Sequence, residues 1–131
     1  MAETKVTING ETNGGGAWQS WTPTFSNSNG TLTMNVTYAK YMVIGKTVFW
    51  RIMCNTTAVS TPGGLYFTPP VAPIHVTQWT GSGREDAATG KMFEILFKGS
   101  STAMNVMFYD NTGSTCTNGY LYIMGGSYEG V

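Results

Sequence analysis

Strict alternation of apolar and polar side chains organises the middle of the chain. In residues 31–41 the apolar members of this alternation are Leu32, Met34, Val36 and Tyr38. Because neighbouring side chains of a strand point to opposite faces of a sheet, this segment is predicted to form an antiparallel strand with one buried and one solvated face. Residues 92–97 alternate imperfectly, and residues 103–109 repeat that pattern, so both are predicted to be strands.

A second type of strand is predicted for residues 47–54, which are apolar almost throughout. Only Arg51 interrupts this run, and a continuous apolar run is typical of a strand that is buried on both faces. Gly45 and Lys46 separate the run from the preceding segment and mark a turn. We therefore expect residues 47–54 to lie centrally in a sheet with both faces covered.

No segment of the chain shows the period of an amphipathic helix. Turn-forming residues instead separate about eight short strands at spacings of roughly eight to twelve residues. Four prolines between residues 62 and 73 interrupt the pattern, and proline is confined to edge strands and loops because it lacks a donor N–H. We predict an all-β fold, an antiparallel β-sandwich of jelly-roll type, for residues 17–131.

Residues 1–16 differ from the rest of the chain and are predicted to form an N-terminal arm. Lys5, Val6, Thr7 and Ile8 alternate like a short strand. Residues 9–16 contain four glycines, which restrict the backbone little. We expect a short strand-like arm that is joined to the domain through a glycine hinge.

Charge is scarce, and its balance argues against some classes of function. Seven basic and seven acidic residues give a formal net charge of zero. A nucleic-acid-binding role is not expected, because such affinity needs clustered Lys and Arg to release the counterions of phosphates. No apolar run approaches the ~20 residues of a membrane-spanning helix. The N-terminus also lacks the order of basic, apolar and small residues that marks a signal peptide, so we expect synthesis in a cytoplasm and no membrane insertion.

The cysteines and the single histidine do not indicate a metal site. Cys54, Cys116 and His75 are fewer than the about four ligands of a structural zinc site. Reduced thiols are the default in a cytoplasm, and a disulfide between the two cysteines is the alternative. We expect neither a metal nor a cofactor.

Residues that could carry catalysis are few. His75 has no motif partner, and none of the nucleophile, phosphate-binding or metalloprotease motifs is present. The carboxylates considered for a glycosidase pair are Glu85, Asp86, Glu94 and Asp110. Such a pair must be held about 5–10 Å apart, and the sequence does not indicate this for any two of them. We therefore expect no enzymatic activity.

The charged side chains that do occur gather in residues 82–99, which hold three acidic and three basic residues. Glycines surround residues 84–91, so we predict a loop between strands, exposed or at an interface, whose ions pair with each other or with a neighbouring subunit. Exposed ion pairs contribute only ~0–1 kcal/mol to stability. Specificity of docking is therefore the better role for them.

Aromatic rings beside polar side chains are the stronger candidates for a binding function. Flat rings stack on the apolar faces of sugars, while Asn, Asp and Arg bind the hydroxyl groups. The residues predicted to contact a host-surface glycan or a protein partner are Trp79, Arg84, Glu85, Asp86 and Tyr120. The alternative for each ring is a place in the core or in a subunit interface, where aromatic residues are also common.

Two motifs stand at the start of the domain. Residues 18–24 read W-Q-S-W-T-P-T, and residues 38–48 read Y-A-K-Y-M-V-I-G-K-T-V. A proline-marked segment with the sequence TPP follows within residues 65–73. Together they resemble the small β-domains of tailed-bacteriophage virion proteins, in which the third segment usually reads LP. These domains occur in receptor-binding tips of tail fibres and in small decoration proteins of heads and tails.

The resemblance covers residues 17–131 and implies a non-enzymatic, jelly-roll-like domain at the virion surface, commonly a homotrimer. The first function that it implies is a decoration or accessory protein of capsid or tail. The arm residues Lys5, Val6, Thr7 and Ile8 would then anchor it by adding a strand to other virion proteins. The alternative is a receptor-binding tip domain that recognises glycans on the host surface. A carbohydrate-active enzyme or a bacterial lectin is a third, weaker class.

Overall fold

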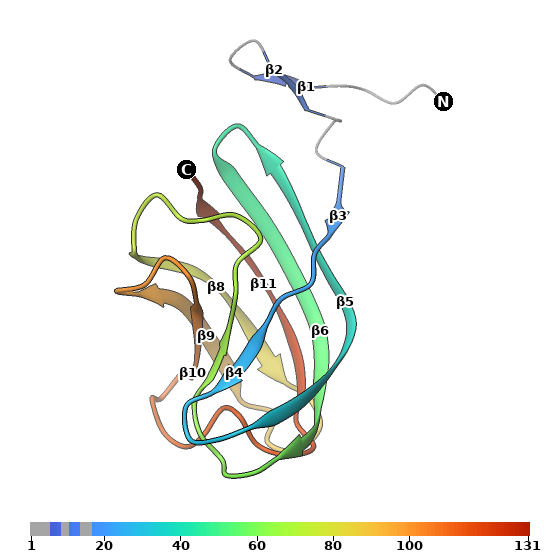
Figure 1. Ribbon diagram of the computed structural model, residues 1–131, viewed down its shortest axis with the longest axis vertical. Coiled ribbons are helices and arrows are strands. Elements are labelled where there is room, and N and C mark those ends of the chain that lie inside the picture. Colours follow the sequence, from blue (N-terminus) through green and yellow to red (C-terminus); the bar gives the residue numbers. More distant parts are fainter. Residues whose placement is uncertain (1–5, 9–10, 14–16) are drawn as a thin grey trace.

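A computed structural model describes residues 6–8, 11–13 and 17–131 of the chain (Figure 1). Its strands are β1 (Val6–Ile8), β2 (Glu11–Asn13), β3 (Gln19–Ser20), β4 (Phe25–Asn27), β5 (Leu32–Ile44), β6 (Thr47–Val59), β7 (Leu65–Phe67), β8 (Thr77–Glu85), β9 (Met92–Lys98), β10 (Met104–Phe108) and β11 (Leu121–Glu129). These ranges contain no helix, which confirms the predicted all-β class. Accordingly, no helix in them is long and apolar enough to cross a membrane.

Nine strands form one curled antiparallel sheet in the order β3-β5-β6-β11-β8-β9-β10-β7-β4. Its edge strands, β3 and β4, belong to one segment that crosses from one end of the sheet to the other. Trp21 N–H donates to the Ala39 carbonyl of β5 at 3.1 Å, whereas the Thr24 carbonyl accepts from Thr68 N–H, just after β7, at 3.1 Å. The sheet therefore curls into a half-barrel (Figure 1). The jelly-roll sandwich stays a prediction.

The inner face of the curl holds the hydrophobic core. Its largest fully buried side chains include Trp50, Tyr122, Phe67, Phe93, Phe97, Ile52, Leu65, Ile95 and Met104. The ring centroid of Phe93 lies 5.2 Å from that of Phe108 and 5.4 Å from that of Tyr122, a stacking that adds to the stabilisation by burial. The alternation predicted for residues 92–97 and 103–109 is confirmed, because every second side chain of β9 and β10 is buried.

The alternation predicted for β5 is wrong in its second half. Leu32 and Met34 pack against the core as expected. A register shift between Val36 and Tyr38 marks a β-bulge, in which one extra residue opposes the partner strand. Because the side-chain period is two, one extra residue moves the following positions to the other face. Tyr38 therefore pairs with Met53 on the outer face, and the buried position passes to Ala39.

Residues 47–54 lie centrally in the sheet, as predicted. The prediction that both faces of this strand are covered is wrong. β6 lies between β5 and β11, well inside the sheet. Its inner side chains are buried, whereas Phe49 and Met53 on the outer face are half-buried and Arg51 is exposed. The outer face carries both apolar and polar side chains, and it has no second layer of strands in the part of the chain that the structure describes.

The described residues of the N-terminal arm form two strands that pair with each other. Val6, Thr7 and Ile8 make β1, which confirms the short strand, whereas Lys5 lies outside the described residues. β1 pairs with β2 and with no strand of the nine-stranded sheet. Residues 11–13 of the expected glycine hinge are therefore a strand in this structure.

Both cysteines are free thiols in the core, which agrees with the default expectation. Burial raises the pKa of Cys54 to about 12 and also raises the pKa of Cys116. Since only the thiolate is a good nucleophile, we expect neither cysteine of the folded protein to react with Ellman's reagent. Both should react once the protein is unfolded in denaturant. Rapid release of thionitrobenzoate from the native protein would contradict this placement.

Candidate functional site

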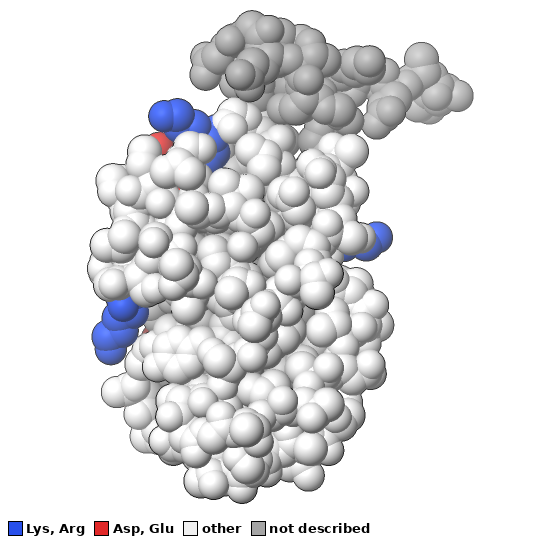
Figure 2. Space-filling view, viewed as in Figure 1, with Lys and Arg blue, Asp and Glu red and all other residues white. Residues whose placement is uncertain are grey.

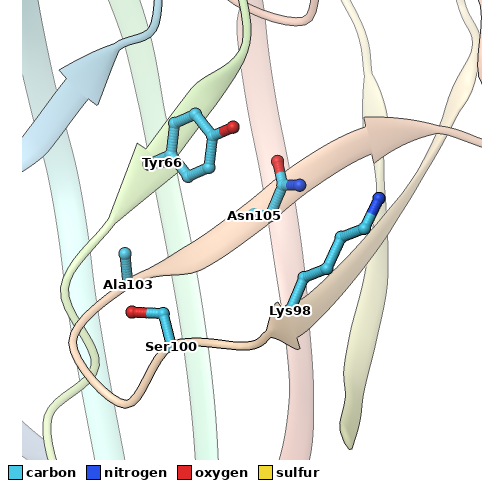
Figure 3. Close-up of a pocket in the computed structure, with 5 residues that line it drawn as sticks. All are labelled: Tyr66, Lys98, Ser100, Ala103 and Asn105. Carbon is cyan, nitrogen blue, oxygen red and sulfur yellow. The ribbon is translucent and has the colours of Figure 1, made fainter. Parts of the chain in front are cut away.

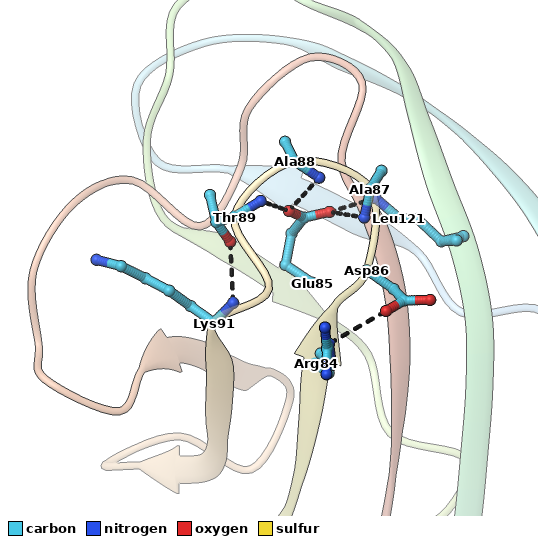
Figure 4. Close-up of polar contacts among 8 residues, drawn as sticks. All are labelled: Arg84, Glu85, Asp86, Ala87, Ala88, Thr89, Lys91 and Leu121. Atoms are coloured by element: carbon cyan, nitrogen blue, oxygen red, sulfur yellow. Dashed lines mark hydrogen bonds and ion pairs between the residues drawn. The ribbon is translucent and has the colours of Figure 1, made fainter.

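The charged loop after β8 is built around Glu85, the last residue of that strand (Figure 4). Its carboxylate accepts hydrogen bonds from the backbone N–H groups of Ala87 at 2.7 Å, Ala88 at 2.8 Å and Thr89. A fourth N–H, that of Leu121 at the start of β11, donates at 3.1 Å. The side chain is fully buried, so Glu85 organises the loop and is not placed to contact a ligand.

The hydrogen bonds decide the charge state of Glu85. Burial by itself raises the pKa of this carboxyl, because it disfavours the ionised form. The N–H groups of Thr89, Ala87, Ala88 and Leu121 stabilise that form and outweigh burial, so the pKa falls from 4.5 to about 2. Glu85 is therefore a structural anion at neutral pH. A general acid would need the opposite shift, toward the working pH.

The neighbours of Glu85 are exposed and pair with each other. Arg84 Nε lies 3.1 Å from Asp86 Oδ1 (Figure 4). Lys91, at the far end of the loop, pairs with Asp110 at 3.4 Å. These are the two ion pairs among the described residues, and their exposure limits each to ~0–1 kcal/mol. The interpretation of a loop whose ions pair with one another is thus correct for Arg84 and Asp86.

The predicted aromatic contacts do not join this loop. Trp79 lies on the same strand as Arg84 but five residues earlier, roughly 16 Å away at ~3.3 Å per residue. Its side chain is 58% exposed. Tyr120 is half-buried, and its ring packs edge-on against Phe108 and Tyr122, with centroids 6.3 and 6.2 Å apart. Tyr120 therefore belongs to the border of the core rather than to an open platform.

A hollow lies on the outer face of β9, β10 and β7. It has a volume of about 420 Å³ and is lined by Tyr66, Lys98, Ser100, Ala103 and Asn105 (Figure 3). These residues come from β7, from β10 and from the end of β9 with the loop that follows it. The hollow opens on the convex side of the sheet, away from the core.

The strand register joins Trp79 to this hollow. Trp79 is opposite Leu96, Leu96 is opposite Asn105, and Asn105 is opposite Tyr66. Four neighbouring strands thus place these residues in one row, and the row is roughly 14 Å long at ~4.8 Å per strand. Trp79 is among the contact residues predicted from the sequence, whereas Tyr66 and Asn105 are not. The outward positions of β10 were visible in its alternation, whereas the pairing with β7 was not.

A second hollow, of about 260 Å³, lies on the outer face of β5 and β6 and is lined by Tyr38, Lys40 and Arg51. The Arg51 guanidinium lies 4.4 Å from the centroid of the Trp18 ring and 6.0 Å from that of Tyr38. Such cation–π contacts contribute about 0.5–1 kcal/mol at exposed sites. The contact between Arg51 and Trp18 holds the segment before β3 against β6.

Catalytic or metal-binding groups do not gather in the described part of the chain. No group of three or more His, Cys, Asp or Glu residues there is placed to hold a metal ion. His75 is exposed in the loop before β8. The face of the molecule shown in Figure 2 is almost free of charge, with Lys and Arg only near its margins. This face therefore offers apolar surface and hydrogen-bonding groups rather than charge.

Comparisons with protein-family models, with curated proteins and with solved structures find no match to this chain.

Proposed function

We propose that the protein is a non-enzymatic structural protein of a bacteriophage particle, a surface-exposed decoration or accessory protein of capsid or tail that is anchored by its N-terminal arm. The proposal takes its biological setting from the resemblance of residues 17–131 to virion β-domains. We further propose that the curled sheet is a variant of the jelly-roll sandwich, in which the segment from β3 to β4 passes between the two halves.

The observation that carries the anchoring role is the separation of β1 and β2 from the large sheet. The two strands pair only with each other among the described strands. A two-stranded hairpin has two open edges, and an isolated one is at best marginally stable in water. Addition of its edge to a sheet of another virion protein would satisfy those backbone groups. A partner of this kind is therefore expected for the arm.

Apolar side chains on the domain surface support contacts with further subunits. Val76, Trp79, Met92 and Tyr109 are each about half exposed or more, and Ile123 is 39% exposed. Ile123 and Met92 flank Arg84 in one row across β11, β8 and β9. Apolar patches rimmed by polar residues mark interaction surfaces. A homotrimer or a lattice neighbour is the partner that we propose for this row.

The test compares the full chain with a variant that lacks residues 2–16. Binding of both proteins is measured to purified particles without the protein and to host cells, after circular dichroism has shown that both are folded as β-proteins. We expect the deletion to abolish particle binding. Undiminished particle binding by the truncated chain would contradict anchoring through the arm.

The polar hollow on the outer face favours a second candidate function, a receptor-binding tip domain that recognises host-surface glycans. It combines an aromatic ring, an amide and an ammonium group, and Trp79 lies in the same row. The same two proteins separate this candidate from the first. Host-cell binding that survives the deletion, without any particle binding by the full chain, would favour the receptor-binding function.

A further inference from the structure

We propose that the hollow lined by Tyr66, Lys98, Ser100, Ala103 and Asn105 binds an acidic saccharide, one that carries a carboxylate. This inference deepens the receptor-binding candidate and is independent of the decoration role. The volume of the hollow, about 420 Å³, falls within the range of about 300–1,000 Å³ that is usual for small-molecule sites. Figure 3 shows the lining side chains, with Asn105 between Tyr66 and Lys98.

The polar groups of this hollow are available to a ligand. Within the described residues, no hydrogen bond is made by the Tyr66 hydroxyl, the Asn105 amide or the Lys98 ammonium. This differs from the asparagines Asn27 and Asn35, whose amides donate to other protein groups. Asn105 is half-buried on a strand and is therefore held in place without being used by the fold.

The charge of the hollow selects the class of saccharide. None of its five lining residues is acidic. The two ion pairs of the described residues involve Arg84 and Lys91, so Lys98 keeps an uncompensated positive charge. A carboxylate on the ligand would form a charge-assisted hydrogen bond with it, which is roughly twice as strong as a neutral one. A neutral sugar would leave this group unused.

The remaining groups fit the other parts of a sugar ring. The Asn105 amide offers two donors and an acceptor for adjacent hydroxyl groups. The Tyr66 ring offers an apolar surface for the C–H face of the sugar, and its hydroxyl is a further donor or acceptor. The Ser100 hydroxyl lies 3.1 Å from that of Thr102, which orients it at the rim.

Trp79 extends the surface beyond one sugar unit. It is separated from Asn105 only by Leu96, so the indole stands two strands away, roughly 10 Å at ~4.8 Å per strand. Its exposed ring can stack on a neighbouring unit of a chain. We therefore expect oligosaccharides to bind more tightly than the corresponding monosaccharides.

The test uses an array of immobilised uronic-acid and nonulosonic-acid oligosaccharides, each beside its carboxyl-reduced, neutral counterpart. We expect the full chain to bind at least one acidic member and to lose about ten-fold in affinity on its neutral counterpart, the size of one charge-assisted contact. Lys98→Gln should cause a similar loss on the acidic member and little change on the neutral one. Lys46→Gln, in the turn between β5 and β6, is the matched control and should leave binding unchanged.

Asn105→Ala and Trp79→Ala provide independent readouts, with the melting temperature measured to show that each variant is folded. Asn105→Ala should weaken binding to both acidic and neutral members, whereas Trp79→Ala should weaken binding to oligosaccharides more than to monosaccharides. Absence of binding across the array, equal binding of the acidic and neutral members, or full binding by Lys98→Gln would overturn the proposal. Particle binding through the arm would be unaffected by any of these outcomes, so a failure here is distinguishable from a failure of the decoration role.

Discussion

Replacing Glu85 by glutamine is expected to lower the free energy of unfolding at neutral pH by about 3 kcal/mol. The carboxylate accepts four backbone N–H groups, and its pKa falls from 4.5 to about 2. One pKa unit corresponds to about 1.4 kcal/mol. Glutamine has a single acceptor oxygen, and its amide NH₂ would face N–H donors, so buried donors would lose their partners. Urea unfolding at pH 7 measures the difference.

The same carboxylate should make stability depend on pH in acid. The folded protein holds Glu85 ionised down to about pH 2, whereas the unfolded chain takes up its proton near 4.5. The unfolded state therefore binds more protons between these values. The contribution of Glu85 is complete above about pH 4.5 and is lost as the pH falls toward 2. The Glu85→Gln variant should lack this part of the loss of stability in acid.

A control variant at a second carboxylate makes the Glu85 experiment specific. Glu94→Gln removes a carboxylate on the neighbouring strand that is half-buried on the outer face, and it should change the free energy of unfolding by less than about 0.5 kcal/mol. Asp110 also has a lowered pKa, first through the Thr112 hydroxyl, so some acid sensitivity should persist. An unchanged acid transition in Glu85→Gln would show that Glu85 does not anchor the loop.

Glu85 also shows how far the sequence predicts a site. The loop could be predicted from neighbouring residues alone, because the carboxylate is followed by small residues and surrounded by glycines. The donor from Leu121 comes from a different part of the chain, so the burial of Glu85 depends on strand order. Adjacent charges in a sequence therefore do not distinguish a ligand contact from a residue that holds its own loop.

In the sheet, too, the correct predictions rest on neighbouring residues, and the incorrect ones concern features that depend on strand pairing. Phe93 and Ile95 alternate with outward residues without interruption, and both are buried. Tyr38 belongs to an equally regular pattern, but the bulge beside it is defined by the register with β6. The hollow beside Asn105 depends on a pairing with Tyr66 in a proline-rich segment. The alternation of side chains within a segment thus predicts a strand. The position of a bulge or of a surface site also depends on the strand with which that segment pairs.

Replacing Gly126 by alanine is expected to destabilise the fold by about 3 kcal/mol, the upper end of the usual cost of overpacking. Gly126 of β11 lies opposite Gly81 of β8. A Cβ at Gly126 would overlap the Thr80 carbonyl oxygen and lie 2.5 Å from the Gly81 Cα. These are backbone atoms, so relief requires one strand to move. The free energy of unfolding, measured in urea, should fall accordingly.

The environment of Thr80 explains why the strand cannot move cheaply. Thr80 is buried beside a register shift in β8, and its hydroxyl donates to the Ile95 carbonyl of β9 at 2.9 Å. A displacement of β8 would disturb this bond and the position of Trp79 on the outer face. Gly64→Ala is the matched control, because its Cβ would meet its nearest neighbours only at 3.4 Å, and we expect a loss below about 1 kcal/mol. Wild-type stability in Gly126→Ala would show that β8 and β11 do not approach this closely.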